Sequence, residues 1–286
     1  MLMRALLFLL SASFTLQVSA APQITWLQTD WPPHQIVSGP FQGQGTFDLL
    51  QQQLMAALPE FKHQSRLVSL ARVEQLFLQQ LPGFCAIGTL YSTQRAASRL
   101  FSTPLAVGPA LAVVHLATHP GLAQAGADAL EINQLAQQAQ LVGAYQPNRY
   151  YPPVVMQAIQ QPASNLTSQT FTSELNAAQL LQSGRVDYVI EYPERMRYYN
   201  SLLAQPVALQ HSAIVGADIA NVSYVSCTTG KAGQQAIAAI DKALQQLWRS
   251  ADYQAAMRRW LDDAAWQRLS PQLEQIRLSY QTADTR

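Results

Sequence analysis

Two side chains in the first part of the sequence have the chemistry to hold a small polar ligand. Arg95 carries a planar, permanently charged guanidinium that matches the two oxygens of a carboxylate. Trp31 stands beside two prolines that fix a turn after an expected strand, and an aromatic ring in such a place can stack on a ligand. Each residue also has a simpler explanation. An arginine near a helix start is commonly solvated or salt-bridged, and a tryptophan at a turn often packs on its own domain.

The acidic and histidine residues give no sign of a catalytic or metal site. The five histidines are scattered, with no pair at helical spacing, so we expect no metal and no cofactor. Glu191, Glu194 and His34 are the candidates for acid–base chemistry, and none has an evident partner in the sequence. There is no nucleophile elbow, phosphate loop or Ser-His-Asp order. The sequence therefore predicts a binding protein with no catalytic residue, and not an enzyme.

The elements that must position these side chains alternate along the chain. Such alternation of strands with amphipathic helices predicts an α/β fold with mostly parallel sheets. The first helix begins near Thr46. A later helix is expected to reach Ser183 from a cap at Ser173 and to stop at Gly184. The expected strands are 24–28, 65–70, 84–88, 111–116, 140–145, 186–190 and 224–227, with further helices at 73–81, 154–160 and 237–247.

The first twenty residues have the pattern of an export signal: Arg4, an apolar run and a small-residue cleavage site that ends at Ala20. A retained N-terminal anchor is the alternative. No later stretch reaches the roughly 20 apolar residues of a transmembrane helix. Arg4 is the only charge in this segment, so its removal leaves 17 basic and 17 acidic groups. A neutral surface argues against nucleic acid or an anionic membrane as a partner. We therefore expect a periplasmic protein.

The two cysteines, Cys85 and Cys227, fit this compartment in two ways. An even pair in an oxidising environment suggests a disulfide, and two separate buried thiols are equally consistent with the sequence.

Several short motifs also follow one another in a characteristic order. They are Trp31-Pro32-Pro33, Gly45-Thr46-Phe47-Asp48, Gly88, Ser92-Thr93-Gln94-Arg95, Phe101-Ser102 and Leu181-Gln182-Ser183-Gly184-Arg185-Val186-Asp187. In this order and spacing the chain, from about 24 to 260, resembles the family 3 extracellular (periplasmic) solute-binding proteins of the amino-acid-binding type. Its departures from their pattern indicate a divergent branch.

The resemblance implies a two-lobed, type II periplasmic-binding-protein-like fold with two hinge crossings. Each lobe would be a mixed, mostly parallel sheet flanked by helices. Lobe 1 would comprise 22–110 and 217–264, lobe 2 would comprise 111–216, and 265–286 would form a C-terminal helix and tail. In this fold the strands of the two cysteines are neighbours, so the resemblance implies a disulfide between Cys85 and Cys227.

The resemblance also implies a ligand site. The family uses the arginine that matches Arg95 for the α-carboxylate of the ligand, and Trp31, Gly88 and Ser92 fall in the same first-lobe motifs. The second lobe departs from the pattern. The usual Gly-Ser or Gly-Thr donors are replaced by a loop in which Asn148 and Arg149 are the candidate anion donors.

The acid for the ligand amine is also displaced. Its position is occupied by Tyr192, and Glu191 lies one residue earlier, where a strand points its side chain to the opposite face. Glu191 is expected either to contact the ligand or to form a salt bridge at the strand edge. Tyrosines at 145, 150 and 151 would suit a ring in the ligand, or simply pack the loop.

These features predict a monomeric binding protein that closes on a small polar, carboxylate-bearing ligand and delivers it to the permease of an ABC transporter. A free amino acid is the first expectation for the ligand, beside a small peptide, an aromatic or opine-like acid or another carboxylated metabolite. A module that signals to a membrane sensor is the alternative function, and an enzyme of the same fold, similar to a dehydratase, is a more distant one.

Overall fold

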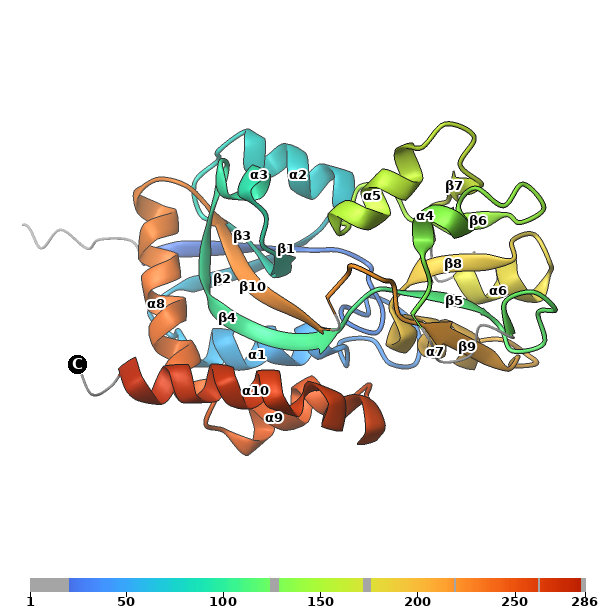
Figure 1. The fold of residues 1–286 in the computed structure, drawn as a ribbon. Coiled ribbons are helices and arrows are strands. Elements are labelled where there is room, and N and C mark those ends of the chain that lie inside the picture. Colours follow the sequence, from blue (N-terminus) through green and yellow to red (C-terminus); the bar gives the residue numbers. More distant parts are fainter. Residues whose placement is uncertain (1–20, 124–128, 172–175, 219, 262, 284–286) are drawn as a thin grey trace, which may run out of the picture.

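The computed structural model describes residues 21–123, 129–171, 176–218, 220–261 and 263–283. The export signal expected at 1–20 lies outside these ranges. The described chain forms two α/β lobes side by side, each built on one five-stranded sheet (Figure 1). Within the described chain, no helix has the length and apolar character needed to cross a membrane.

The first lobe holds a sheet with the strand order β2-β1-β3-β10-β4. β1 is parallel to β2 and β3, and β10 runs antiparallel between β3 and β4. The last strand, which follows the second lobe in the sequence, thus returns to the first sheet and lies inside it, not at its edge. The strands are β1 (Gln23–Gln28), β2 (Lys62–Leu67), β3 (Phe84–Leu90), β4 (Arg99–Pro109) and β10 (Ala220–Thr228).

Helices cover both faces of this sheet (Figure 1). They are α1 (Thr46–Ala57), α2 (Leu70–Leu78), α3 (Thr93–Ala96), α8 (Lys231–Leu247), α9 (Ala251–Arg258) and α10 (Asp263–Ala283). The apolar spacing of α1 buries Leu50 and Leu54 completely against the sheet. The C-terminal helix α10 begins two residues before the expected 265, and its buried Ile276 and Tyr280 belong to the core of the first lobe.

The second lobe holds a sheet with the strand order β7-β6-β8-β5-β9. Its strands are β5 (Ala112–Leu116), β6 (Gly143–Tyr145), β7 (Leu166–Ser168), β8 (Tyr188–Glu191) and β9 (Leu209–Ser212). Its helices are α4 (Ile132–Leu135), α5 (Pro153–Gln160), α6 (Ala177–Gln182) and α7 (Pro193–Ser201). The expected cap Ser173 lies outside the described residues. Asn176 caps α6 instead, where its side-chain oxygen accepts a hydrogen bond of 3.0 Å from the backbone of Gln179.

The chain passes between the lobes at 110–111 and again between β9 and β10. The lobes also meet at a third place, where a segment of the first lobe packs against the second lobe and the chain does not pass from one lobe to the other. The segment 29–45, between β1 and α1, reaches the second lobe and buries Ile36 in its core. Asp48 fixes this segment, because its carboxylate accepts hydrogen bonds from the backbone of Ile36 (2.8 Å) and Gly45 (3.0 Å). The Gly-Thr-Phe-Asp motif therefore anchors the segment that carries Trp31.

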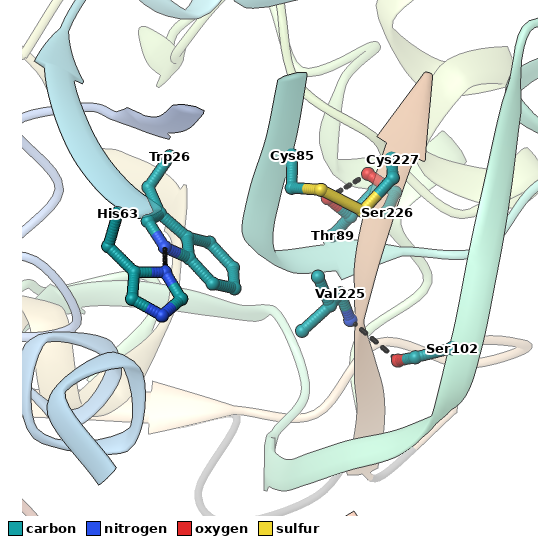
Figure 2. The surroundings of a disulfide bond; sticks show 8 residues. All are labelled: Trp26, His63, Cys85, Thr89, Ser102, Val225, Ser226 and Cys227. Atoms are coloured by element: carbon teal, nitrogen blue, oxygen red, sulfur yellow. Dashed lines mark hydrogen bonds between the residues drawn. A yellow bond between two sulfur atoms is a disulfide. The ribbon is translucent and has the colours of Figure 1, made fainter. Parts of the chain in front are cut away.

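A disulfide joins two adjacent inner strands of the first lobe's sheet (Figure 2). Cys85 on β3 and Cys227 on β10 face each other in the antiparallel ladder, and their sulfur atoms are bonded. The pairing is the one that the resemblance implied. It closes a loop with a sequence separation of 142 residues, which encloses the whole second lobe. Cross-links of such long loops contribute about 4–5 kcal/mol in the chain-entropy model.

Candidate functional site

A cavity of about 120 Å³ lies between the lobes, at the carboxyl ends of strands from both sheets. This is where α/β sheets usually bind ligands. Four of the seven residues predicted to bind the ligand line it: Trp31, Gly88, Arg95 and Arg149. Ser92, Asn148 and Glu191 are not among its lining residues. The other lining residues are Leu27, Thr29, Gln35, Phe47, Leu70, Val73, Glu74, Ala86, Ile87, Thr89, Leu90, Arg99, Tyr150 and Tyr192.

Arg95 enters the cavity from α3 as part of a small ionic group. Its guanidinium donates to the backbone oxygen of Leu90 (3.1 Å) and to Glu74 Oε1 (3.2 Å). Arg99 Nη2 binds the other oxygen of Glu74. Burial is the main cause that lowers the pKa of Arg99, and Glu74 opposes it. Two arginines thus share one carboxylate, which leaves this wall of the cavity with a net positive charge.

Ser92 positions Arg95 and does not face the cavity. Its hydroxyl accepts a hydrogen bond of 3.2 Å from the backbone of Arg95 and caps the four-residue helix α3. The Ser-Thr-Gln-Arg motif therefore orients the arginine through the helix start.

The second lobe contributes a buried charge cluster. Glu191, at the end of β8, is fully buried between two arginines. Its Oε1 accepts from Arg149 (2.7 Å) and from the backbone of Tyr192 (2.8 Å), and its Oε2 accepts from Arg195 (3.3 Å). Burial alone raises the pKa of Glu191, but the two arginines outweigh it, so the pKa lies below its ordinary value. Glu191 is therefore an ionised partner of arginines inside the second lobe.

Arg149 is the member of this cluster that reaches the cavity. It also donates to the backbone oxygen of Ile190 (2.9 Å), and its Nε has no hydrogen-bond partner among the described residues. Aromatic rings surround its charge, with Tyr151 at 4.7 Å and Tyr192 at 5.3 Å from the guanidinium carbon. Asn148, its neighbour, is exposed and adopts a left-handed backbone conformation with φ 63°. The loop thus points the arginine inward and the asparagine outward.

Trp31 lies at the boundary of the two lobes. The guanidinium carbon of Arg195 sits 3.7 Å from the centre of its ring, and that of Arg149 lies at 5.4 Å. A first-lobe aromatic ring therefore covers the arginines of the second lobe, which places Trp31 in an interlobe contact and not on a free lobe surface. Such cation–π contacts contribute about 0.5–2 kcal/mol each.

The ring of Phe47 leaves no space for a side chain at position 88, which is a glycine. A Cβ at position 88 would lie 2.1 Å from Phe47 Cε2, and the glycine has φ +75°. The β3–β10 ladder shifts register at this point, between Tyr224 and Ser226. On the other side of β10, the ladder with β4 also shifts register here, and the backbone N–H of Val225 donates to Ser102 Oγ at 2.9 Å (Figure 2). The shift in the β3–β10 ladder is a bulge in β3. This bulge brings the backbone of Gly88 to the cavity wall.

A second cavity of about 70 Å³ adjoins the first. Both are lined by Trp31, Phe47, Gly88, Leu90 and Tyr192. His34 and Glu194, named from the sequence only as acid–base candidates, line the second cavity. Burial raises the pKa of Glu194 to about 8. Burial, aided by the charge of Arg195, lowers the pKa of His34 to about 4. Both side chains are therefore neutral near pH 7.

Sequence reasoning missed several residues of this region. Arg195 and Glu74 had no motif to mark them, because their roles come from contacts with residues distant in sequence. Tyr151 was a candidate for stacking, and its hydroxyl instead exchanges hydrogen bonds with the backbone of Gln146 at 2.8 and 3.0 Å. Among the described residues, no group of three His, Cys, Asp or Glu side chains is arranged to hold a metal ion.

No protein-family model matches the sequence, and no curated protein sequence matches it. Solved structures do match the fold. The substrate-binding protein of an amino acid ABC transporter is 16% identical and has a TM-score of 0.62, and the match covers 84% of this chain and 99% of that one. A putative L-cystine ABC transporter protein from Listeria monocytogenes is 14% identical with a TM-score of 0.66, over 85% of this chain and 98% of that one.

A protein of another role has the same architecture. A histidine kinase sensor domain with similarity to periplasmic binding proteins is 16% identical with a TM-score of 0.64, and the match covers 84% of this chain and 96% of that one. At these identities the likeness concerns the fold. The chain therefore has the two-lobed periplasmic-binding-protein-like fold found in substrate-binding proteins of amino acid ABC transporters.

Proposed function

We propose that this chain is a solute-binding protein that holds a small carboxylate-bearing molecule between its lobes, without catalysis, and delivers it to an ABC transporter. The observation that carries the proposal is the placement of Arg95 and Arg149, which reach one cavity from opposite lobes. An anion between them would contact both lobes and so favour the closed arrangement. Arginine suits this role because its fork binds carboxylates in a bidentate manner.

The charges of the site favour an organic acid over an α-amino acid. An amino acid also needs an acceptor for its ammonium group. Glu191 already accepts hydrogen bonds from Arg149, Arg195 and the backbone of Tyr192. Glu74 is shared by Arg95 and Arg99. We therefore place the net charge of the preferred ligand at −1 or below.

Thermal shift measurements test this function. The protein without its first 20 residues is screened against amino acids, their analogues that lack the α-amino group, and other small carboxylates. A ligand that binds only the folded state raises the melting temperature. We expect a saturable rise that Arg95→Ala and Arg149→Ala each abolish and that Arg277→Ala, an exposed site on α10, leaves intact. A rise that survives both cavity variants, or no rise with any carboxylate, contradicts the proposal.

Signalling to a membrane sensor is the second candidate, because a histidine kinase sensor domain has the same fold. Both functions use the same closure on a ligand, so they differ only in the partner. Transport predicts that cells without the chain lose uptake of the labelled ligand. Sensing predicts that uptake persists while a transcriptional response to the ligand disappears.

A further inference from the structure

The second cavity contains a buried carboxyl group that the proposed carboxylate site does not use. Glu194, in the first turn of α7, has a side chain that is only 4% exposed. Neither of its carboxyl oxygens has a hydrogen-bond partner among the described residues. His34 Nε2 lies 3.6 Å from Glu194 Oε1, beyond hydrogen-bond distance. Buried polar groups are almost always bonded, so an unbonded acid at a cavity wall indicates a ligand contact.

Two other polar side chains of this cavity already have protein partners. Asn221 donates to the backbone oxygen of Pro109 (3.2 Å), and Ser223 donates to that of Ala106 (3.3 Å). His34 Nδ1 is buried without a hydrogen-bond partner among the described residues, like the acid beside it. Glu194 and His34 thus place buried, unbonded polar atoms at the same part of the cavity wall.

The rest of the cavity wall is mostly apolar. It includes Phe47, Val107, Met257, Trp260 and Leu261. A methylene chain that enters from the arginine side would pass residues common to both cavities before it meets the acid. The two cavities together thus present an anion-binding end, an apolar middle and a carboxyl end.

The local charges decide which group fits the carboxyl end. Burial raises the pKa of Glu194 to about 8, so the group stays protonated up to about that pH. The charge of Glu191 acts in the same direction as burial, while the backbone amide of Glu194 itself and the charges of Arg197 and Arg195 oppose it. A protonated carboxyl has one donor and one acceptor on the same edge, as a primary carboxamide does. A cationic group at this end would lie close to the buried arginines, and like charges repel one another strongly in a medium of low dielectric.

We propose that the second cavity is a subsite for a neutral carboxamide at the far end of the ligand, bound by paired hydrogen bonds to the carboxyl group of Glu194. This inference rests on the proposed function, since Arg95 and Arg149 hold the carboxylate of the same molecule. The ligand class is an organic acid with a terminal amide. Loss of the pair leaves a buried amide unbonded, which is the kind of mismatch that polar sites reject strongly.

Matched ligands test the subsite by calorimetry. Succinamate, glutaramate and adipamate are each compared with the alkanoate in which an isopropyl group replaces the carboxamide. The two members of a pair have nearly the same shape and the same charge. We expect one amide to bind at least tenfold more tightly than its isopropyl analogue at pH 6.5. The variants are Glu194→Gln, which keeps a donor and an acceptor, and Glu194→Met, which keeps the length and removes both.

Three readouts decide the outcome. The amide preference should remain in Glu194→Gln and vanish in Glu194→Met, while the isopropyl analogues bind both variants as they bind the wild type. In the wild type the preference should fall as the pH rises above 8, because the carboxylate no longer donates; in Glu194→Gln it should stay constant. Preference in Glu194→Met, or none in the wild type, overturns the subsite.

Failure of the carboxylate site itself gives a different pattern. If the isopropyl analogues bind and Arg95→Ala or Arg149→Ala abolishes that binding, the proposed function stands whatever the amide does. If no member of either series binds, or if neither Arg95→Ala nor Arg149→Ala weakens binding, the proposed function is wrong. The proposed subsite is then wrong as well.

Discussion

At the scale of single residues, the main departure from the expected ligand site is the position of Glu191. A free acid beside the cavity would serve an amine, but this acid is ionised and fully enclosed by Arg149 and Arg195. The role of Glu191 is structural, because without its carboxylate two guanidinium groups would remain in a buried region with too few hydrogen-bond acceptors. Its hydrogen bond also helps to orient Arg149, which lines the cavity.

Replacement of this acid should therefore cost stability. We expect Glu191→Gln to lower the free energy of unfolding by about 3–5 kcal/mol, the usual result when one partner of a buried ion pair is removed. Urea denaturation measures the change. Glu274→Gln is the matched control, because Glu274 pairs with Arg277 at an exposed site on α10 and should change stability by less than about 0.5 kcal/mol. Equal effects of both variants would show that the buried cluster contributes no more than a surface pair.

The raised pKa of Glu194 should make the stability of the protein depend on pH. Its pKa is about 8 in the folded chain, against an ordinary 4.5. Below pH 4.5 the group is protonated in both the folded and the unfolded chain, so its titration does not change the free energy of unfolding. As the pH rises from 4.5 to 8, the unfolded chain releases this proton and the folded chain retains it, so stability falls by up to about 1.4 kcal/mol per pH unit.

Glu194→Gln removes this dependence. Relative to the wild type, we expect the variant to gain stability steadily between pH 5 and pH 8, as measured by urea denaturation without ligand. The lowered pKa of His34 acts in the opposite sense, since it costs stability as the pH falls from 6.5 toward 4. Both proteins contain His34, so the comparison isolates the acid. A constant difference across this range would mean that Glu194 is ionised in the folded chain.

At the scale of elements, the bulge in β3 connects the packing of α1 to the shape of the site. Phe47, from α1, lies where a side chain at position 88 would have to be. The ring and the glycine backbone form a wall shared by both cavities. The shape of both cavities therefore depends on how closely this helix approaches the sheet.

Gly88→Ala should disturb that approach. A methyl group at this position collides with the Phe47 ring and adopts a strained backbone conformation, so we expect a loss of about 1–3 kcal/mol and weaker ligand binding. Gly184→Ala, just after α6, also adopts a left-handed backbone conformation, meets no atom within 4 Å and lines neither cavity, so it is the control. Addition of Phe47→Leu should restore part of the loss, since it relieves the collision. If Gly88→Ala and Gly184→Ala behave alike, the close contact is not important for the site.

At the scale of the whole molecule, two lobes meet across a charged and aromatic boundary. Trp31 from the first lobe covers arginines of the second, while Ile36 from the same segment is buried in the second lobe's core. The segment that carries both residues is held to α1 by Asp48. A ligand that binds Arg95 and Arg149 together would add to this boundary and stabilise the closed arrangement.

Closure gives a prediction for the molecule in solution. We expect small-angle X-ray scattering to show a smaller radius of gyration when a carboxylate ligand saturates the protein. Arg149→Ala should leave the radius unchanged at the same ligand concentration, because the second lobe then lacks its anion contact. A ligand that binds without any change in radius would show that both arrangements bind it equally well.

The sequence by itself determined the fold class and the order of the elements. Alternating strands and amphipathic helices record which face of each element is buried, and this local pattern does not depend on distant residues. The order of short motifs, through the resemblance to a known family, indicated two lobes and the pairing of Cys85 with Cys227, and it marked Trp31, Gly88 and Arg95, which line the cavity. Arg149, which also lines it, was a candidate from a loop that departs from the family pattern. Element ends were less accurate: β6 begins at Gly143 and not at 140, because propensity changes gradually along the chain.

Only the tertiary structure decided how the charged groups divide between structure and binding. The sequence left two roles open for Glu191, and the fold encloses it because Arg195 approaches from α7 and Arg149 from the loop after β6. Glu194 and His34 had no visible partner in the sequence, and the fold buries both at one cavity wall. Charge, burial and hydrogen bonding depend on neighbours brought together from distant parts of the chain, and no local pattern of residues records those neighbours.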